Sequence, residues 1–515
     1  MMNIDLPLAP GVGQTDTICA PCTQSGGAIT VVRVSGPQAV ACVDSIFASP
    51  KGLPLAERKS HTIAFGRILD DKHEVVDEVV VSLFRGPQSY TGEDVVEISC
   101  HGSRYILHTV LDLLVSNGCR MALPGEFTQR AFLNGKMDLS QAEAVADLIA
   151  SDSSASHRIA MNQMRGNFSK QLKVLRDQLL HLTSLMELEL DFSDHEELEF
   201  ADRSQLLDIS NEVYRTISKL ANSFKLGNAL KNGVPVAIIG ETNAGKSTLL
   251  NSLLGDEKAI VSDVHGTTRD VIEDTINLRG VTFRFIDTAG IRHTDDPVES
   301  IGIARSYQKM EQAEIILWVI GDAKAHNADL QQKVTGDGDT LADLQQKVTD
   351  EVNTLADLQQ KATGDVNTLA DLQQKVMEVA EDKKVVLLFN KSDILTEAER
   401  TALTEQYANI GIPHLFISAK CGEGMPELEE TLLQIADLPQ CSSEDIIVTN
   451  LRHYEALISA LDAVERVQMG MQSGLSGDFI SQDLRECIHH LSDIVGEVST
   501  DSVLQNIFKH FCIGK

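Results

Sequence analysis

The sequence has no long apolar run, no excess of positive charge and few cysteines. Its longest apolar stretches, such as Ile315–Ile320, are far shorter than the roughly 20 residues that cross a bilayer, so we expect no membrane-spanning helix. With 44 Lys+Arg against 75 Asp+Glu, the net charge is −31. This disfavours non-specific binding of nucleic acid by a broadly positive surface and leaves RNA to a local patch.

Signals for export are also missing. The first residues, MMNIDLPLAPGVG, have neither the positive start nor the apolar stretch of a secretory signal. Nine scattered cysteines leave one unpaired in any full pairing. We therefore expect a reducing, cytoplasmic environment and no membrane partner. The pair Cys19 and Cys22 is interpreted as structural and unpaired, because one CxxC without a second ligand pair is a weak redox or zinc motif. Cys487, His489 and His490 are expected on a helix surface, because a zinc site requires four converging donors.

The chain has 515 residues, 43% of them hydrophobic and 23% charged, which is enough apolar material for several cores and about three or four domains. Short β-branched runs at 28–34, 78–84 and 95–99, with an amphipathic helix at 105–116, predict a small α/β domain over residues 1–136. From residue 137 the period becomes helical, and residues of one apolar face follow 4-3-4-3-4 spacing: Phe168, Leu172, Leu175, Leu179, Leu182 and Met186.

Strand-like runs then return at 234–239, 282–286, 314–320, 385–389 and 414–417, which is typical of a parallel-sheet α/β domain. After about residue 438 the pattern is helical again, over too few residues to hold a large core alone. We predict a helical domain built from 137–231 and 439–515, with an α/β domain at 232–438 inserted into it. The hexapeptide ADLQQK begins at Ala328, Ala342, Ala356 and Ala370. This 14-residue repeat, at about 325–376, is interpreted as a surface expansion, with a partner-binding arm as the alternative.

The clearest motif begins at Gly240, where GETNAGKS matches GxxxxGKS between a predicted strand and a helix. Such a loop turns its backbone N–H groups onto phosphates, Lys246 reaches the terminal phosphates, and the Ser247 hydroxyl can bind Mg²⁺. Three later segments, HGTTRD at 265–270, DTAG at 287–290 and NKSD at 390–393, resemble the switch and base-recognition motifs of translation-factor-like GTPases. The Asp393 carboxylate suits the N–H groups of guanine, so GTP rather than ATP is expected.

Ser418, Ala419 and Lys420 match the fifth motif of these GTPases, which lies behind the base. The resemblance therefore implies a large nucleotide site. It comprises Asn243, Ala244, Gly245, Lys246, Ser247, Thr248, Ser262, Thr267, Thr268, Asp287, Thr288, Ala289, Gly290, Asn390, Lys391, Asp393, Ser418, Ala419 and Lys420. Ile291 stands where Ras-like enzymes carry a glutamine that orients water, so another device is needed. Asn243 offers an oxygen at which a monovalent cation could bridge the phosphates, although an Asx turn explains an asparagine there equally well.

Three further segments carry a resemblance over nearly the whole chain. They are FCIGK at 511–515, PGEFTQRAFLNGKMDLSQAEAVADLI at 124–149 and YTGEDVVE at 90–97. Together with the GTPase motifs they resemble the MnmE family, also called TrmE, the GTPases of tRNA wobble-uridine modification. The family's fold is a folate-binding α/β domain, a helical domain and an inserted Ras-like GTPase domain. The segment TQSGGA at 23–28 departs from the family's usual glycine loop.

The resemblance implies folate contacts at Arg33, Glu97, Lys136 and Lys515, with Cys512 close to the one-carbon unit of 5-formyl- or methylene-tetrahydrofolate. Without it, Arg33 and Lys136 would be interpreted as surface charges and Glu97 as a strand-end residue. It further implies catalytic roles for Lys246, Glu299 and Cys512, and Mg²⁺ on Ser247 and Thr268. It also places K⁺ near four residues: Asn243, Ser262, Val264 and Thr267.

The implied assembly is a homodimer that works on tRNA with a MnmG-type (GidA) flavoprotein, which brings FAD and NADH, as a heterotetramer. The implied reaction adds a carboxymethylaminomethyl or aminomethyl group to C5 of the wobble uridine. The alternative function is a ribosome-assembly factor of the Era or Der type, but those proteins usually carry a basic RNA-binding domain. A stand-alone folate aminomethyltransferase would leave the GTPase motifs unexplained.

Overall fold

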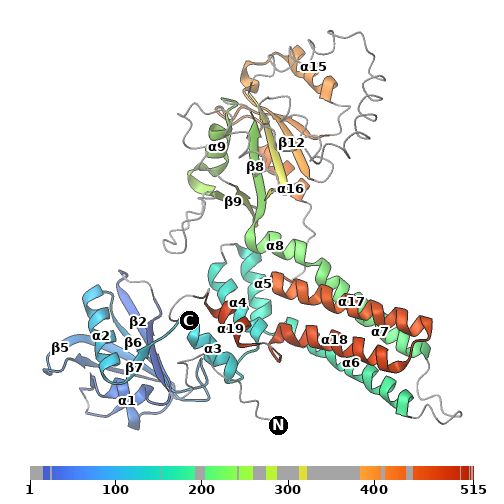
Figure 1. The fold of residues 1–515 in the computed structure, drawn as a ribbon. Helices are drawn as coiled ribbons and strands as arrows, with labels where there is room; N and C mark the ends of the chain where they lie inside the picture. The colour runs from blue at the N-terminus through green and yellow to red at the C-terminus, as the bar shows by residue number, and fades with distance from the viewer. Residues whose placement is uncertain are drawn as a thin grey trace, which may run out of the picture. The chain divides into compact units, whose positions relative to one another are not determined.

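The computed structural model describes residues 16–23, 26–50, 52–151, 153–191, 203–240, 243–258, 274–286, 312–321, 383–407, 412–436, 445–498, 500–509, 511 and 514. The chain divides into two compact units, each described by itself below (Figure 1). Unit 1 comprises residues 1–151, 157–224 and 446–515, and unit 2 comprises residues 152–156 and 225–445. None of the described helices is long and apolar enough to cross a membrane. The repeats at about 325–376 lie outside the described residues.

Unit 1 begins with a seven-stranded sheet in the order β3-β4-β5-β6-β2-β1-β7. The strands are β1 Thr17–Pro21, β2 Ile29–Ser35, β3 Phe47–Ala48, β4 Thr62–Leu69, β5 Val75–Phe84, β6 Val95–His101 and β7 Cys119–Met121. Its short helices are α1 Ala39–Asp44, η1 Leu55–Glu57 and α2 Arg104–Ser116. The predicted strands at 28–34, 78–84 and 95–99 and the predicted helix at 105–116 are confirmed as β2, β5, β6 and α2.

One face of this sheet is the core of the domain. Along β5, Val79, Val81 and Leu83 are buried while the residues between them are more exposed, as expected for side chains that alternate between two faces. The buried residues pack with apolar side chains of α1 and α2 into a single cluster. The predicted α/β character of this region is therefore confirmed.

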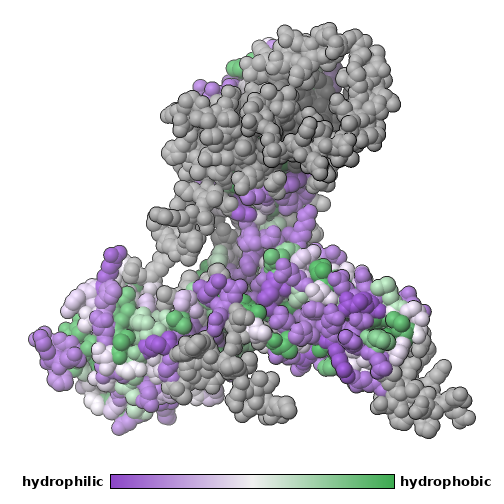
Figure 2. All heavy atoms as spheres, viewed as in Figure 1, coloured by the Kyte–Doolittle hydropathy of each residue, from purple (hydrophilic) through white to green (hydrophobic). Residues whose placement is uncertain are grey.

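The rest of the described part of unit 1 is helical. Its helices are α3 Glu126–Leu133, α4 Leu139–Ala150, α5 Ser154–Met164 (of which 154–156 belong to unit 2), α6 Asn167–Asp191, α7 Arg203–Asn222, α17 Leu451–Ser473, α18 Gly477–Val495 and α19 Asp501–Phe508. Helices α6, α7, α17 and α18 lie side by side as a bundle (Figure 1). The predicted stripe from Phe168 to Met186 is buried in its core. Hydrophilic residues cover most of the described surface in the view of Figure 2, broken by smaller apolar areas.

The expectation for Cys487 was wrong. Its side chain is buried in the bundle core, and burial raises the pKa of the thiol to about 12. The reason is the helical period of α18, which places Cys487 three residues after Leu484 and four before Leu491, on the apolar face. His489, two residues further along, is exposed.

A buried ion cluster ties α4 to the second half of the helical region. Arg452 Nε and Nη2 lie 3.0 and 3.1 Å from the two carboxylate oxygens of Glu143, and His453 Nε2 lies 2.5 Å from Glu143 Oε2. Arg452 also donates to the carbonyls of Asp493 and Ile494 at the end of α18, where cations are favoured. Burial alone would raise the pKa of Glu143, but His453 and Arg452 lower it to about 2.

Unit 2 contains a six-stranded sheet in the order β13-β12-β11-β8-β10-β9, in which only the β9–β10 pair is antiparallel. The strands are β8 Val234–Gly240, β9 Asp274–Leu278, β10 Val281–Phe285, β11 Ile315–Ile320, β12 Lys384–Phe389 and β13 His414–Phe416. The helices described here are α8 Phe224–Asn232, α9 Lys246–Lys258, η3 Ser392–Ile394, α15 Glu397–Tyr407 and α16 Met425–Ala436. The central strands are buried on both faces, so the predicted parallel-sheet α/β character is confirmed.

Candidate functional site

The phosphate-loop motif lies between the central strand β8 and helix α9. Asn243 and Gly245 both have positive φ, at 63° and 95°, and α9 begins at Lys246. Lys246 Nζ donates to the carbonyl of Gly240 at 2.7 Å, so its ammonium spans the two ends of the loop. The start of a helix carries unsatisfied N–H groups and positive partial charge, which makes this loop an anion site.

Two glycines of the motif are required by close packing. A Cβ at Gly240 would lie 2.1 Å from the carbonyl oxygen of Val319, and one at Gly245 would lie 2.1 Å from Asn390 Nδ2. Both residues also have positive φ, which side chains other than glycine rarely adopt. The sequence pattern GxxxxGKS therefore reflects the packing of the loop against β11 and against the NKSD segment.

The NKSD segment is joined directly to the phosphate loop. Asn390 is buried; its Nδ2 donates to the carbonyl of Ala244 at 2.8 Å, and its Oδ1 accepts from the N–H of Ala419 at 3.1 Å. One amide thus connects three predicted motifs. Lys391 adopts a left-handed conformation and precedes the short helix η3, and its side chain is exposed.

Asp393 lies at the open side of this frame. Its Oδ1 accepts from Ser418 Oγ at 2.7 Å, while the carboxylate itself is exposed. Ser418 is buried, and its carbonyl accepts from the N–H groups of Cys421 and Gly422 in the turn that follows. The side chain of Lys420 is exposed. The structure therefore brings Asp393 and the Ser418–Lys420 turn together, with one carboxylate oxygen already oriented.

Ser247 and Thr248 lie in the first turn of α9. The other predicted residues of this site lie outside the described residues. They are Ser262, Val264, Thr267, Thr268, Asp287, Thr288, Ala289, Gly290 and Glu299. Of the predicted folate residues, Lys515 lies outside them too, as does Cys512.

In unit 1, Arg33 and Glu97 face each other across β2 and β6. They are paired in the antiparallel register, and Arg33 Nε and Nη2 lie 3.0 and 2.9 Å from Glu97 Oε1. The Arg33 guanidinium lies over the rings of Tyr90 and Phe127, with centroid distances of 5.0 and 5.6 Å. These two rings were not predicted as site residues, because a residue's contact with Arg33 cannot be deduced from spacing alone.

The end of the chain meets this pair. The carbonyl of Gly514 accepts from Arg33 Nη1 at 3.4 Å and from the Cys22 thiol at 3.2 Å. A Cβ at Gly514 would lie 2.1 Å from the carbonyl oxygen of Pro21, so the tail approaches β1 closely. Lys136 instead donates to the carbonyl of Pro87 at 2.7 Å, in the same loop that carries Tyr90.

A network of buried charges supports that loop. Arg130 donates to Asp16, Glu93 and Glu126, and Arg120 donates to Asp16 and Glu126. Burial alone would raise the pKa of Glu126, but the hydrogen bonds from Arg120 and Arg130 lower it. The loop is therefore held by ionised groups that are paired, as buried charges must be.

Cys19 is a free, buried cysteine, whereas the Cys22 thiol donates to the carbonyl of Gly514. Hydrogen bonding to Cys119 lowers the pKa of the buried Cys19 thiol. Among the described residues, no group of three or more His, Cys, Asp or Glu side chains could hold a metal ion.

Two family models match the chain. The GTP-binding protein TrmE N-terminus matches residues 17–136, and the MnmE helical domain matches residues 139–512. The tRNA modification GTPase MnmE of Bacteroides fragilis is 56% identical over 504 residues, which is 97% of this chain and 99% of that protein. The protein of the same name from Phocaeicola vulgatus is 53% identical over 534 residues, again 97% of this chain and 99% of that protein.

Among solved structures, Era in complex with MgGDPNP and nucleotides 1506–1542 of 16S ribosomal RNA aligns with a TM-score of 0.23 and 25% identity. That alignment covers 45% of this chain and 66% of Era, and its similarity is too low to support an argument about fold or function. The two family models and the nearly full-length relatives are sufficient by themselves. This chain belongs to the MnmE family of tRNA modification GTPases.

Proposed function

We propose that this chain, with a flavin-dependent partner, adds a carboxymethylaminomethyl or aminomethyl group to C5 of the wobble uridine of tRNA. The carbon comes from a tetrahydrofolate one-carbon unit. As a member of its family the chain is a GTP-hydrolysing enzyme. One observation supports a function beyond hydrolysis. The chain contains a phosphate loop closed by the bond from Lys246 to Gly240 and, separately, an Arg33–Glu97 ion pair that contacts Gly514 near the C-terminus.

At the nucleotide site, the chain's own residues supply binding and orientation. The Lys246 ammonium has three donors, so it can contact phosphate oxygens while it keeps its bond to Gly240. Ser418 occupies one oxygen of Asp393, and the carboxylate has further lone pairs for the guanine N–H groups. Lys391 and Lys420, both exposed beside this frame, would flank the base, with Ser247 and Thr268 as the Mg²⁺ ligands.

Hydrolysis is assigned to residues that take over the role of the water-orienting glutamine of Ras-like enzymes, which is Ile291 in this chain. Asn243 is exposed in the loop with a left-handed backbone, so its oxygen can contribute to K⁺ binding with Ser262, Val264 and Thr267. Glu299 would orient the water, directly or through a second water. Positive charge beside the leaving phosphate is the contribution that K⁺ supplies when bound.

The folate centre is assigned to Arg33, Glu97, Lys136 and Lys515, with Cys512 close to the one-carbon unit. A carboxylate such as Glu97 can accept from the amino and N–H groups of a pterin, and cations can pair with the anionic tail of folate. The Arg33 guanidinium keeps Nη1 near the tail carbonyl, which links folate binding to the position of the C-terminal residues.

The proposed organisation follows the family. The GTPase domain, 232–438, is inserted between helical segments 137–231 and 439–515, after a folate-binding and dimerisation domain at 1–136. The division into units, in which residues 225–445 separate two parts of unit 1, supports this organisation. A homodimer would bind a MnmG-type flavoprotein, the source of FAD and NADH, and tRNA.

Mass spectrometry of tRNA nucleosides from a deletion strain tests the proposal. We expect loss of the C5-modified wobble uridine and its return when the intact gene is restored. An unchanged nucleoside profile would contradict the proposal. The alternative, a ribosome-assembly factor of the Era or Der type, predicts accumulation of immature ribosomal subunits with normal tRNA nucleosides, and the family match does not favour it.

A further inference from the structure

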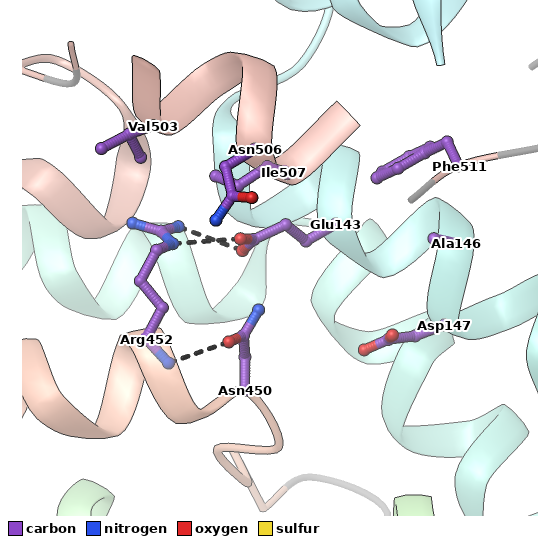
Figure 3. Close-up of a pocket in the computed structure, with 9 residues that line it drawn as sticks. All are labelled: Glu143, Ala146, Asp147, Asn450, Arg452, Val503, Asn506, Ile507 and Phe511. Carbon is purple, nitrogen blue, oxygen red and sulfur yellow. Dashed lines mark hydrogen bonds and ion pairs between the residues drawn. The ribbon is translucent and has the colours of Figure 1, made fainter. Parts of the chain in front are cut away.

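A cavity of about 500 Å³ lies in unit 1 between α4, the start of α17 and α19 (Figure 3). Glu143, Ala146 and Asp147 line it from α4, and Asn506 and Ile507 line it from α19. Phe511 closes a further side and immediately precedes Cys512 in the sequence. A volume of this size is in the range of small-molecule sites, which is about 300–1,000 Å³.

The charges of the lining argue against an anionic ligand. Arg452 is the one cation among the lining residues, all of which the structure describes. Its guanidinium donates to both carboxylate oxygens of Glu143 and to the carbonyls of Asp493 and Ile494, so most of its N–H groups are already engaged. Glu143 is likewise engaged by Arg452 and His453. A phosphate in this cavity would find no further positive partner in the lining.

Three other polar side chains of the lining, Asn450, Asn506 and Asp147, suit the edge of a neutral, flat molecule. Asn450 accepts the N–H of Arg452 through its oxygen, which leaves its NH₂ group as a donor. Figure 3 shows the side chains of Asn450, Asn506 and Asp147 approaching the same space from three directions. A carboxylate has about four acceptor positions, so Asp147 can accept from a ligand in addition to other contacts. Ile507 and Phe511 add apolar contact area for a ring.

We propose that this cavity binds the uracil base of an RNA nucleotide that has been turned out of its stack, an inference that rests on the proposed function. The pairing edge of uracil presents an oxygen, an N–H and a second oxygen. Two amide NH₂ groups and one carboxylate are complementary to that edge. Bases turned out in this way are read by hydrogen bonds to the pairing edge and by packing against aromatic or apolar side chains.

Asp147 would be the residue that distinguishes uracil from cytosine. An asparagine side chain can donate or accept, so Asn506 tolerates either O4 of uracil or the amino group of cytosine. A carboxylate only accepts. It pairs with the N3–H of uracil but faces a lone pair at N3 of cytosine, and two acceptors that face each other repel.

The test is equilibrium binding of two adenine-rich single-stranded RNAs, identical except for one central U or C, to the full-length protein. We expect the wild type to prefer the U strand roughly tenfold, as for one well-matched base contact. Asp147→Asn should bring the U-to-C ratio close to one, because its amide can turn to donate to N3 of cytosine. Asp177→Asn, an exposed residue on α6, is the matched control and should keep the wild-type ratio.

A second pair of variants guards against a folding artefact. Asn506→Ala should weaken the binding of both RNAs several-fold without removing the preference for U. Replacing the exposed neighbouring residue, in Gln505→Ala, should change neither the affinity nor the preference. GTP turnover and melting temperature, measured on the same preparations, should be unchanged in all four variants. Equal binding of U and C by the wild type, or an unaltered ratio in Asp147→Asn, would overturn the inference.

Failure of this inference is distinguishable from failure of the proposed function. If the deletion strain loses the modified nucleoside but the protein binds U and C equally, the proposed function stands and the cavity is not the base site. If the nucleoside profile is normal but Asp147→Asn removes a U preference, the cavity is a base site in a protein of another function.

Discussion

Replacing Glu143 by glutamine tests how much the buried ion cluster stabilises unit 1. Glutamine keeps the shape of the side chain but removes the charge that faces Arg452 and His453. The guanidinium would retain the carbonyls of Asp493 and Ile494, yet it would lose its buried counter-ion. We expect the free energy of unfolding of unit 1 to fall.

The magnitude follows from the pKa of Glu143. The pKa lies at about 2 in the folded protein against 4.5 as its ordinary value. At about 1.4 kcal/mol per pH unit, this difference corresponds to about 3–4 kcal/mol of stability. This value lies within the roughly 3–5 kcal/mol of stability that is lost when one partner of a buried ion pair is removed.

The assay is urea unfolding of the full-length chain with two probes. Trp318, the only tryptophan in the sequence, lies buried in β11 and reports on unit 2. Far-ultraviolet circular dichroism reports mainly on helices, among them the long helices of the bundle in unit 1. Glu143→Gln should move the circular dichroism transition to lower urea and leave the fluorescence transition unchanged.

Glu486→Gln is the control, because the Arg466–Glu486 pair in the same unit is largely exposed. An exposed pair contributes about 0–1 kcal/mol, so this variant should resemble the wild type. A loss below about 1 kcal/mol in Glu143→Gln, or equal movement of both transitions, would refute the reasoning.

The pH dependence provides a second test with a definite sign. Because the folded pKa of Glu143 is depressed, its stabilisation is fully present above about pH 4.5 and is lost as the pH falls towards 2. The stability difference between wild type and Glu143→Gln should therefore shrink over that interval. A constant difference would show that Glu143 does not stabilise the fold through its charge.

The remaining predictions concern the proposed chemistry. Asp393→Asn should shift preference from GTP to xanthosine triphosphate, measured as the ratio of the two turnover rates; an unchanged preference would count against the guanine site. Replacing K⁺ by Na⁺ should lower GTP turnover. Equal rates in the two salts would contradict the proposal that Asn243 helps to bind K⁺. Glu299→Ala should retain GTP binding but slow hydrolysis by roughly 10²–10⁴-fold, measured in single-turnover assays. A wild-type rate would show that Glu299 takes no part in hydrolysis. Cys512→Ser should abolish tRNA modification while GTP turnover and melting temperature stay normal, and normal modification would exclude a chemical role for the thiol.

Strands that are buried on both faces could be predicted from the sequence. Each residue of β11 is buried, so the strand is a continuous apolar run that a short window detects. The strand β1 was missed because it is short and ends at Pro21, a residue that weakens a strand prediction. In β4, Gly66 interrupts the pattern, and its reason is tertiary: a Cβ there would lie 2.4 Å from the ring of Phe47.

The chemistry of the candidate sites was predictable, but the contacts within them were not. The spacing GxxxxGKS places Lys246 at a helix start on local grounds alone. The bond from Asn390 to Ala244 joins residues 146 positions apart, and the Arg33–Glu97 pair depends on the register of β2 and β6. Such contacts are set by how strands associate, which a single sequence does not specify.

The discontinuity of unit 1 has a consequence for how the protein is made. Residues 225–445 of unit 2 are contiguous, so their sheet can form as soon as they leave the ribosome. Helices α6 and α7 are synthesised earlier, but their core is shared with α17 and α18. The apolar faces of α6 and α7 therefore stay uncovered until the residues after Ile446 have left the ribosome. A ribosome that stalls within the GTPase segment would leave a folded sheet tethered to an open half-bundle, the kind of intermediate on which chaperones act.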